Sequence, residues 1–330
     1  MENTTTAEQS ISTRAALRFV VLIGIVSLFA DMTYEGARSI NGPYLAVLGA
    51  SGTVVGIVSG LGELIGFSIR LVSGYFSDKT KGYWTITFFG YAVNLIAAPM
   101  LALTGNWQFA ALLMIVERIG KGIRVPPRDA MLSYATQRMG RGWGFGLHEA
   151  LDQLGAITGP LVMAAVLFLR DGYKTAYGVL LIPALLALGV LTAARFMYPR
   201  PQDLEFSQTK LQVEGFSRNF WLYVLATAFI AAGFADFPLI AYHFQKASTA
   251  NETLIPILYA VAMGVDAVAA LAFGRLFDRF GLSTMMLVAV LSAFFAPMVF
   301  FGGFSLAVLG MVLWGIGIGA QESIIRAALA

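Results

Sequence analysis

Ten long apolar runs limit what this chain can fold into more than any other feature of its sequence. Each run is long enough to cross a bilayer, since a membrane helix takes about 20 apolar residues. Every backbone polar group needs a partner inside hydrocarbon, so repeated runs of this length predict helices rather than loops or open sheets. The predicted helices cover about residues 17–39, 52–76, 84–103, 107–125, 142–169, 173–197, 220–242, 254–277, 283–301 and 306–329.

The composition excludes several other classes of protein. The 330 residues are 58% hydrophobic and 12% charged, whereas soluble domains carry about 25% charged residues. The absence of cysteine excludes disulfides and thiol chemistry, and two histidines leave little for a metal site, so we expect neither a metal nor a cofactor. The net charge of +3 lies in short loops between apolar runs, so we expect no nucleic-acid partner.

A charged turn after the second apolar run has a second copy downstream. Each copy reads Gly-x-x-x-Asp followed by a basic residue, and a further repeat relates Met114–Gly122 to Met311–Gly319. The repeat predicts two pseudo-symmetric helical bundles in parallel orientation, residues 17–197 and 219–330, joined by a polar cytoplasmic linker, 198–218. The residues of the two turns are Gly74, Asp78, Lys79, Gly274, Asp278 and Arg279.

Basic residues gather in alternate loops. These loops follow the second, fourth, sixth and eighth predicted helices, and the opposite loops hold few lysines or arginines. Loops rich in lysine and arginine usually face the cytoplasm. The pattern therefore predicts an all-α polytopic protein of the cell (inner) membrane with a cytoplasmic N-terminus. The polar residues 1–16 are expected to be disordered on that side of the membrane.

Three short motifs resemble those of the major facilitator superfamily of transporters. Residues 74–79 match the superfamily's motif between helices 2 and 3. Residues 118–122, Arg-x-x-Lys-Gly, resemble its helix 4 motif, Arg-x-x-Gln-Gly. Residues 155–160, Gly-x-x-x-Gly-Pro, resemble the first part of its helix 5 motif. The resemblance covers the chain from about Leu17 onward.

The resemblance implies a monomeric transporter that moves a small molecule by alternating access, with the substrate site between two halves. The family has twelve helices and this chain stops after the tenth, so the resemblance implies bundles of six and four helices. It also implies that Asp78 lacks the partner that the family provides at the start of helix 11. Lys81-Gly82 stand where the family has Gly-Arg, so the geometry of this turn is expected to differ.

Ionisable residues form stripes on four predicted helices of the first half. Residues spaced i, i+4 and i+7 share a helix face, and charges inside membrane helices usually face the interior of the bundle. We therefore expect the stripes to meet around a central cavity. The candidate residues for substrate binding and proton coupling are Asp31, Glu35, Arg38, Glu63, Glu117, Arg118, Lys121, Glu149, Asp152 and Gln153.

Helix depth suggests how these charges pair. A carboxylate of the fifth helix, Asp152 or Glu149, is expected to pair with a base of the fourth helix. That base is Arg118 or Lys121. Protonation of the carboxylate would break the pair and let the two halves rock. A purely structural ion pair is the alternative in each case.

The two charged turns are expected to act as a hinge and latch of the cytoplasmic gate. Asp78 would pair there with Arg70, Lys121 or Arg124, which lie nearer the cytoplasmic ends of the second and fourth helices. In the second half, Asp236 and Asp266 are single acids, and the sequence leaves open whether they serve coupling or structure. The expected gate residues are Gly74, Asp78, Lys79, Arg124, Gly274, Asp278 and Arg279.

The expected function is proton-coupled secondary transport, with the lipid bilayer, a small-molecule substrate and protons as partners. A slight excess of acids in the stripes favours export of a cationic or neutral amphiphile, and uptake of a sugar or an organic anion is the alternative. Because the family's last two helices are missing, a non-transporting partner or assembly protein is the alternative of another class. No spacing of nucleophiles or metal ligands indicates an enzyme.

Overall fold

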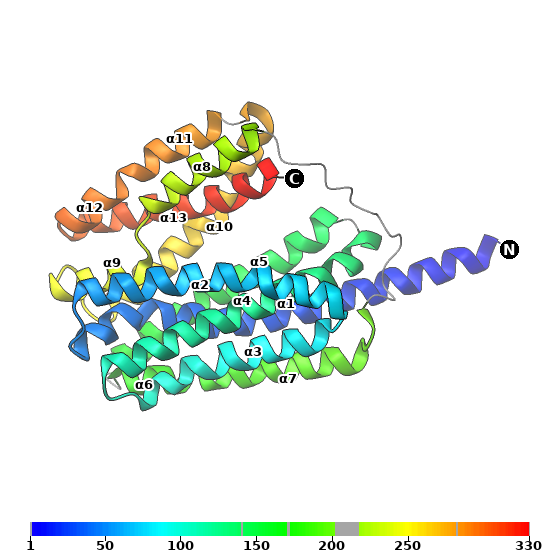
Figure 1. Ribbon diagram of the computed structural model, residues 1–330, viewed down its shortest axis with the longest axis horizontal. Helices are drawn as coiled ribbons and strands as arrows, with labels where there is room; N and C mark the ends of the chain where they lie inside the picture. The colour runs from blue at the N-terminus through cyan, green and yellow to red at the C-terminus, as the bar shows by residue number, and fades with distance from the viewer. Residues whose placement is uncertain (1, 140, 170–171, 202–217, 282, 330) are drawn as a thin grey trace.

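The computed structural model describes residues 2–139, 141–169, 172–201, 218–281 and 283–329. Within these ranges the chain consists of α-helices, one 3-10 helix and short connections, which confirms the predicted all-α membrane fold (Figure 1). The elements are α1 (Glu2–Val47), α2 (Gly52–Thr80), α3 (Tyr83–Met100), η1 (Leu101–Leu103), α4 (Trp107–Met139), α5 (Arg141–Phe168), α6 (Gly172–Val179), α7 (Leu181–Met197), α8 (Arg218–Ala232), α9 (Phe237–Lys246), α10 (Leu254–Phe280), α11 (Ser283–Ala293), α12 (Phe295–Phe301) and α13 (Phe304–Leu329).

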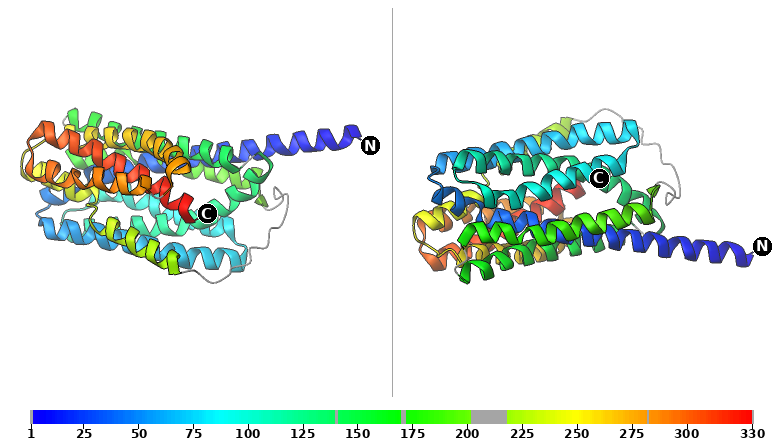
Figure 2. Two further views of the ribbon diagram at one scale, coloured as in Figure 1. Left: turned by 90° about the horizontal axis from the view of Figure 1, so that it is seen from above. Right: turned by 90° about the horizontal axis from the view of Figure 1, so that it is seen from below.

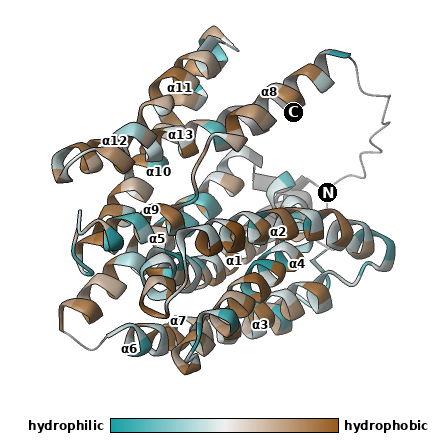
Figure 3. Cartoon of the chain, turned by 60° about the vertical axis from the view of Figure 1, so that its left-hand side comes forward, coloured by the Kyte–Doolittle hydropathy of each residue, from teal (hydrophilic) through white to brown (hydrophobic). Residues whose placement is uncertain are grey.

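The helices form two bundles that lie side by side (Figure 1, Figure 2). One bundle holds α1 to α7 and the other holds α10 to α13, while α9 packs against both α1 and α2. Ile230 near the end of α8 lines a small pocket with residues of α11 and α13. Apolar residues make up most of the helices (Figure 3), and large apolar side chains such as Leu71, Phe196 and Phe301 are exposed, as lipid contact allows. The division into residues 17–197 and 219–330 stays a prediction from the sequence repeat. Most of the predicted linker, 198–218, lies outside the described residues.

Nine stretches of the described chain are long and apolar enough to cross a membrane by length and composition. They account for every predicted membrane helix except the one that corresponds to α4. Charged residues interrupt the apolar run of α4, yet this helix packs along α2 and α3 within the first bundle. Its charges are compatible with a membrane because most of them face the protein interior rather than lipid.

The first helix starts earlier than the sequence predicts. Disorder is predicted for residues 1–16, but α1 begins at Glu2 and continues beyond the end of the bundle (Figure 1). This segment contains neither glycine nor proline. A helix that is already nucleated in the bundle can therefore extend through it at little cost per residue.

The fourth helix ends later than the sequence predicts, because α4 runs through Pro126 and Pro127 to Met139. Pro127 lacks the N–H group that would bond to the carbonyl of Ile123 one turn earlier. The hydroxyl of Ser73 in α2 donates to that carbonyl instead, at 2.6 Å. A neighbouring side chain thus replaces the missing bond, as membrane proteins allow. Arg128 consequently lies on a helix and not in the predicted loop.

Three predicted membrane helices are interrupted. Leu180 separates α6 from α7, Phe294 separates α11 from α12, and residues 233–236 separate α8 from α9. The last break places Asp236 at the N-cap of α9, where its carboxylate accepts a hydrogen bond from the Phe237 N–H at 2.9 Å. An aspartate at the cap and a proline in the first turn both favour a helix start at this point.

Equivalent glycine contacts relate the two bundles. A Cβ atom at Gly122 in α4 would lie 2.5 Å from the carbonyl oxygen of Gly66 in α2. A Cβ atom at Gly319 in α13 would lie 2.2 Å from the carbonyl oxygen of Asp266 in α10. Gly122 and Gly319 are equivalent in the sequence repeat, and Gly66 and Asp266 stand at the same distance before the two charged turns. The same close backbone contact therefore joins the corresponding helices of each bundle.

The two charged turns begin as helix ends. Asp78 and Lys79 still belong to α2, and Lys81 follows its end with a φ of 55°, in the left-handed region. Gly281 follows α10 with a φ of 59°. The family's glycine would stand at the position of Lys81, and a non-glycine residue there carries a steric cost of about 1 kcal/mol. The left-handed turn thus forms although the residue after the end of α2 is a lysine.

Helices α1 and α5 touch through the glycines of the 155–160 motif. A Cβ atom at Gly155 would lie 2.2 Å from the Leu28 carbonyl oxygen, and one at Gly159 would lie 2.3 Å from the Met32 carbonyl oxygen. Side chains cannot fit at such distances, so the two backbones can pack only because both residues are glycines. The motif thus accounts for the packing of the two helices that carry most of the cavity's acids.

We expect Gly155→Leu to lower the free energy of unfolding by about 1–3 kcal/mol, because the added side chain must push α5 away from α1. The decrease would appear as a lower melting temperature of the purified protein. Gly189→Leu in α7 is the matched control, since nothing lies within 4 Å of its Cβ position. Equal melting temperatures for the two variants would contradict the packing argument.

Candidate functional site

A cavity of about 830 Å³ lies between the two bundles. Its walls come from α1, α2, α4 and α5 of the first bundle and from α10 and α13 of the second. Pockets of roughly 300–1,000 Å³ hold small molecules. The position between two bundles is where transporters with internal repeats bind their substrates.

The cavity extends from the middle of α1 toward the end of the molecule that carries the charged turns. Arg38 lines its inner part, and Asp129 of α4 and Phe145 near the start of α5 line its outer part. At the opposite end α9 packs on α1, where a Cβ atom at Gly42 would lie 1.9 Å from the Pro238 carbonyl oxygen. The cavity is therefore closed at the end away from the charged turns.

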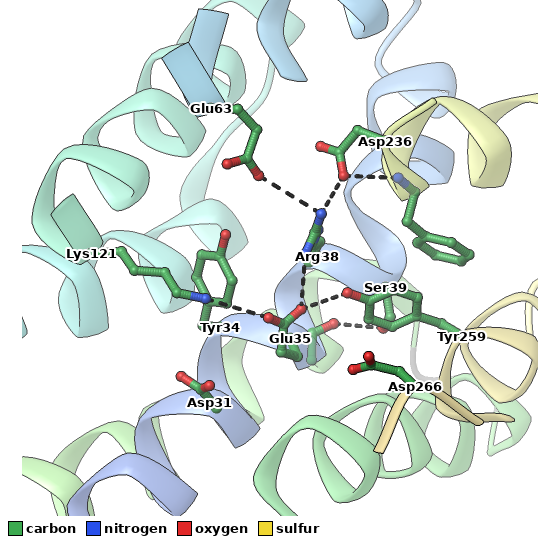
Figure 4. A network of polar contacts seen from close by, with 12 residues as sticks. Asp31, Tyr34, Glu35, Arg38, Ser39, Glu63, Lys121, Asp236, Tyr259 and Asp266 are labelled. Carbon is green, nitrogen blue, oxygen red and sulfur yellow. Dashed lines mark hydrogen bonds and ion pairs between the residues drawn. The ribbon is translucent and has the colours of Figure 1, made fainter. Parts of the chain in front are cut away.

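Two arginines of the first bundle contact the carboxylate of Asp236 at the closed end, and Figure 4 shows the contact with Arg38. Asp236 forms an ion pair with Arg38, and its other oxygen lies 3.5 Å from Arg118. Arg118 also pairs with Glu63 of α2 and donates to the hydroxyl of Tyr34. These contacts tie α1, α2 and α4 to the start of α9.

Glu35 is the centre of a second set of contacts on α1 (Figure 4). It is 6% exposed, and its carboxylate lies 3.5 Å from both Lys121 and Arg38. The hydroxyl of Tyr259 in α10 donates to it at 2.6 Å. Glu35 is therefore neutralised by two bases of its own bundle and also bonded to the other bundle.

Asp31 forms the most buried ion pair of the cavity. Its carboxylate accepts a hydrogen bond from Arg124 at 2.9 Å, and Arg124 is fully buried. The carboxyl group of Asp152 in α5 lies close enough to Asp31 to interact with it. Two carboxyl groups thus lie close together, with the guanidinium group of Arg124 bonded to one of them.

Polar contacts continue from this pair toward the outer part of the cavity. Arg128 pairs with Asp129 at 2.9 Å and donates to the hydroxyl of Ser27 at 3.2 Å. That hydroxyl lies 2.9 Å from the Nε2 atom of His148. Across the cavity, Gln153 of α5 donates to Asp266 of α10 at 3.1 Å and thereby links the two bundles.

The charged wall belongs almost entirely to the first bundle. In the sequence repeat, Arg118 corresponds to Gly315 and Lys121 corresponds to Ile318, and Glu63 corresponds to Met263 by its distance from the charged turn. Met263 and Ile318 line the same cavity. The cavity is therefore amphipathic, with ion pairs on one wall and with apolar Met263 and Ile318 beside Asp266 and Gln321 on the facing wall.

The structure brings together most of the candidate residues from the sequence. Asp31, Glu35, Arg38, Lys121, Glu149, Asp152 and Gln153 line the cavity, and Glu63 and Arg118 belong to the adjoining ion-pair network. Glu117 is 1% exposed and does not line the cavity. It lies one position away from Arg118 on α4 and therefore faces a different side of that helix.

The expected pairs differ from the observed ones. Arg118 pairs with Glu63 and Asp236, and not with an acid of α5. Lys121 pairs with Glu35. Both bases lie nearer to acids of α1, α2 and α9, and helix spacing alone does not define the relative rotation of the helices.

The expected latch between Arg124 and Asp78 is not formed, because Arg124 pairs with Asp31 inside the first bundle. Asp78 instead accepts a hydrogen bond from the Tyr83 hydroxyl at 3.4 Å. Lys79 lies over the ring of Tyr75. The remaining gate candidates lie at the ends of α2 and α10, namely Gly74, Gly274, Asp278 and Arg279.

Sequence reasoning left Asp236 undecided, although it is the acid that joins the bundles. A usable signal is present, because an aspartate followed by Phe237-Pro238 is typical of a helix start. A new helix start within a membrane segment indicates a broken helix, and broken membrane helices often form substrate or ion sites. Tyr34 and Tyr259 were missed as well, since tyrosines in an apolar helix carry no comparable signal.

No group of three His, Cys, Asp or Glu side chains among the described residues could hold a metal ion. The neutralised carboxylates explain this, since each acid of the central network already faces a guanidinium or an ammonium group. The arrangement can bind a polar small molecule and exchange its own ion pairs.

Comparison with known proteins relates the chain to one superfamily. The sequence profile of the Major Facilitator Superfamily matches residues 20–330. An uncharacterized protein of Mycobacterium tuberculosis is 40% identical over 329 residues, which cover 97% of this chain and 80% of that protein. An uncharacterized MFS-type transporter of Methanocaldococcus jannaschii is 25% identical over 276 residues, which cover 82% of this chain and 68% of that protein.

Two solved structures share the fold. A bacterial homologue of the human lysosomal transporter Spinster, in an inward-facing and unoccupied conformation, has a TM-score of 0.68 at 14% identity and covers 94% of this chain and 75% of its own. The nucleoside transporter NupG has a TM-score of 0.68 at 15% identity and covers 92% of this chain and 80% of its own. At such identities the likeness concerns the fold alone.

Proposed function

This chain belongs to the Major Facilitator Superfamily, and from that premise we propose that it is a proton-coupled secondary transporter that moves a small molecule by alternating access. The superfamily and the related folds support secondary transport across a membrane, without an enzymatic step. The proton, the substrate class and the working residues are the parts that we propose.

The shared carboxylate of Asp236 is the observation that carries the proposal. Arg38 and Arg118 of the first bundle both hold it at the closed end of the cavity. If the cavity opens at this end, both contacts must break, and buried charges left without partners are costly. A substrate or a proton that compensates these charges would therefore control the transition between the two states.

We assign the proton to the carboxyl pair of Asp31 and Asp152. Arg124 balances one of the two charges, so the pair is neutral with one proton bound. Asp152 has no ion-pair partner within 4.0 Å among the described residues. It lines the cavity, so a proton can reach it from the open side. Loss of this proton would leave an uncompensated charge between α1 and α5.

The charged turns are proposed to form the gate at the open end. Their residues lie at the ends of α2 and α10, which occupy equivalent places in the two bundles. The positive-inside pattern supports a cytoplasmic location for these turns and for the N-terminus. On this proposal the described state is open to the cytoplasm. The protein would act as a monomer in the cell membrane.

The test is proton movement in liposomes that contain the purified protein and an internal pH dye. A candidate panel should include a nucleoside, because one solved neighbour is a nucleoside transporter, together with organic anions, organic cations and sugars. We expect at least one compound to cause proton flux that protein-free liposomes lack. Binding of panel compounds without any proton flux would contradict proton coupling.

We expect Asp152→Asn to lower substrate-driven proton flux at least about tenfold, which corresponds to roughly 1.4 kcal/mol. Exchange of substrate without a proton gradient should continue, because the asparagine imitates the protonated carboxyl group. Glu252→Gln is the control, since this acid is exposed in the loop before α10. Undiminished proton flux in Asp152→Asn would contradict the assignment of the proton to this pair.

A further inference from the structure

One basic side chain of the cavity has no acid to pair with. Arg38, Lys121, Arg124 and Arg128 each lie within 4.0 Å of a carboxylate. Arg70 of α2 lines the same cavity, but it has no carboxylate within that distance among the described residues. A guanidinium group remains charged at any physiological pH. The cavity therefore presents a positive charge that the protein itself does not neutralise.

Arg70 is held in position by an aromatic ring. Its guanidinium carbon lies 4.4 Å from the centroid of the Phe67 ring, one helical turn away on α2. The Nε atom is buried and has no hydrogen-bond partner in the described part of the chain. Stacking occupies the face of a guanidinium and leaves its edge for hydrogen bonds. Such an edge matches the oxygen atoms of a carboxylate or a phosphate.

Three of the acids that line the cavity already pair with bases. Arg124 pairs with Asp31, Lys121 with Glu35, and Arg128 with Asp129. A cationic substrate would have to displace a base to reach any of these three acids. An anionic head group, by contrast, meets Arg70 without displacing a side chain.

Apolar and amide groups complete the cavity. Phe67, Met263 and Ile318 line it together with Gln153 and Gln321. The Oε1 atom of Gln153 and the Nε2 atom of Gln321 are buried without hydrogen-bond partners in the described structure. A ligand with an apolar body would cover the first group, and polar atoms at its far end would satisfy the amides.

We propose that the cavity binds amphiphilic organic anions, whose oxyanion head pairs with Arg70 while the apolar body lies along Phe67, Met263 and Ile318. The proposal rests on the proposed transport function and names the substrate class of that site. A carboxylate and a phosphate share the relevant chemistry. The head group can thus come from a soluble organic acid or from a phospholipid.

The test is calorimetric binding to the purified full chain in a nonionic detergent. The probes are 2-naphthoate, 2-naphthylmethylammonium and 2-naphthalenemethanol, which share an apolar body and differ in charge. We expect 2-naphthoate to bind with a Kd at least about tenfold lower than either of the others, as one charge-assisted hydrogen bond provides. Equal affinities for the three probes, or preference for the ammonium compound, would overturn the proposal.

Substitution of Arg70 then locates the head group. We expect Arg70→Gln to weaken 2-naphthoate binding by about ten- to a hundredfold. Arg70→Lys should weaken it less, because the positive charge remains and only the planar pair of guanidinium N–H donors is lost. Arg195→Gln is the matched control, since Arg195 is exposed in the last turn of α7. Unchanged affinity in Arg70→Gln would overturn the proposal. If that variant does not fold, Arg70→Lys and the comparison of the three probes decide.

A displacement experiment distinguishes a soluble organic acid from a phospholipid as the source of the head group. Displacement of 2-naphthoate by short-chain phosphatidylglycerol would assign a phospholipid head, and binding that this lipid leaves unchanged would assign a soluble acid. Failure of both ligands to bind at millimolar concentration would overturn the proposal. Binding is measured without a proton gradient, so failed proton coupling would not affect it. Conversely, proton-driven transport of a cation would sustain the transport function and overturn this inference.

Discussion

Replacement of Arg118 by alanine is expected to reduce transport at least about 100-fold and to destabilise the protein. Arg118 holds Glu63 and Asp236 together and bonds to Tyr34. Removal of one partner from a buried ion pair typically costs about 3–5 kcal/mol, and each 1.4 kcal/mol corresponds to about a factor of ten. Substrate-driven proton flux and the melting temperature measure the two effects.

A double variant separates two effects of losing Arg118: the unpaired buried charge that lowers stability, and the missing guanidinium group that lowers transport. Glu63→Gln together with Arg118→Gln removes one acid and one base, while Arg38 continues to hold Asp236. We expect the double variant to regain much of the lost melting temperature and none of the lost flux. Arg195→Ala, an exposed arginine of α7, should change neither property. Wild-type flux in Arg118→Ala would contradict the role proposed for the shared carboxylate.

Replacement of Gly42 by valine is expected to prevent closure of the end away from the charged turns. A Cβ atom at this position would lie 1.9 Å from the carbonyl oxygen of Pro238, and 2.9 Å from the backbone nitrogen of Tyr242. Backbone atoms cannot yield as a side chain can, so α1 and α9 must separate. The equilibrium then shifts toward states that are open at this end, and transport falls because one of the two required states is lost.

Thiol labelling can measure this opening without interference, because the chain contains no cysteine. Ala50→Cys is a suitable reporter, since Ala50 is 4% exposed and its carbonyl accepts a hydrogen bond from Tyr242 at 3.2 Å. We expect Gly42→Val to speed labelling of this cysteine at least about tenfold, a shift of roughly 1.4 kcal/mol. Gly60→Val is the control, because nothing lies within 4 Å of its Cβ position. Equal labelling rates in both variants would show that close packing at Gly42 does not keep this end shut.

The polar stripes could be predicted from the sequence because helical spacing determines which residues share a face. The same spacing does not determine which residues of a neighbouring helix each polar face contacts. Arg118 therefore has the expected place on α4, and its partners are Glu63 and Asp236 in place of an acid of α5. The partners depend on the rotation and height of the neighbouring helices, which are determined by contacts such as that of Gly122 with Gly66.

Helix ends were predictable where local chemistry alone decides them. The start of α2 agrees with the prediction, since Ser51 caps it through the Val54 N–H. The end of α4 was not predictable, because a hydroxyl of another helix, that of Ser73, supports the backbone beyond Pro126. Sequence patterns describe a helix by itself, and in this case tertiary contacts reverse the effect of the prolines.

The sign of the site was not predictable from counting charges. The stripes hold slightly more acids than bases, which favours a cationic substrate. Ion pairs occupy Asp31, Glu35 and Glu63, while Arg70 has no carboxylate within 4.0 Å among the described residues. This is why we propose an anionic head group. The charge available to a ligand depends on what remains after pairing, and pairing is a property of the fold.

The cap of α9 has a consequence for the speed of the return step. The Asp236 oxygen that faces Arg38 is the same atom that accepts the hydrogen bond from the Phe237 N–H. If the bundles separate at this end, the hydrogen bond from the Phe237 N–H still orients the carboxylate of Asp236. Its rotamer is therefore already selected when Arg38 and Arg118 approach it again. Re-forming the ion pairs then costs Asp236 little side-chain entropy. The rate of reclosure should therefore follow the movement of whole helices, with no added delay while a freely rotating side chain finds its partners.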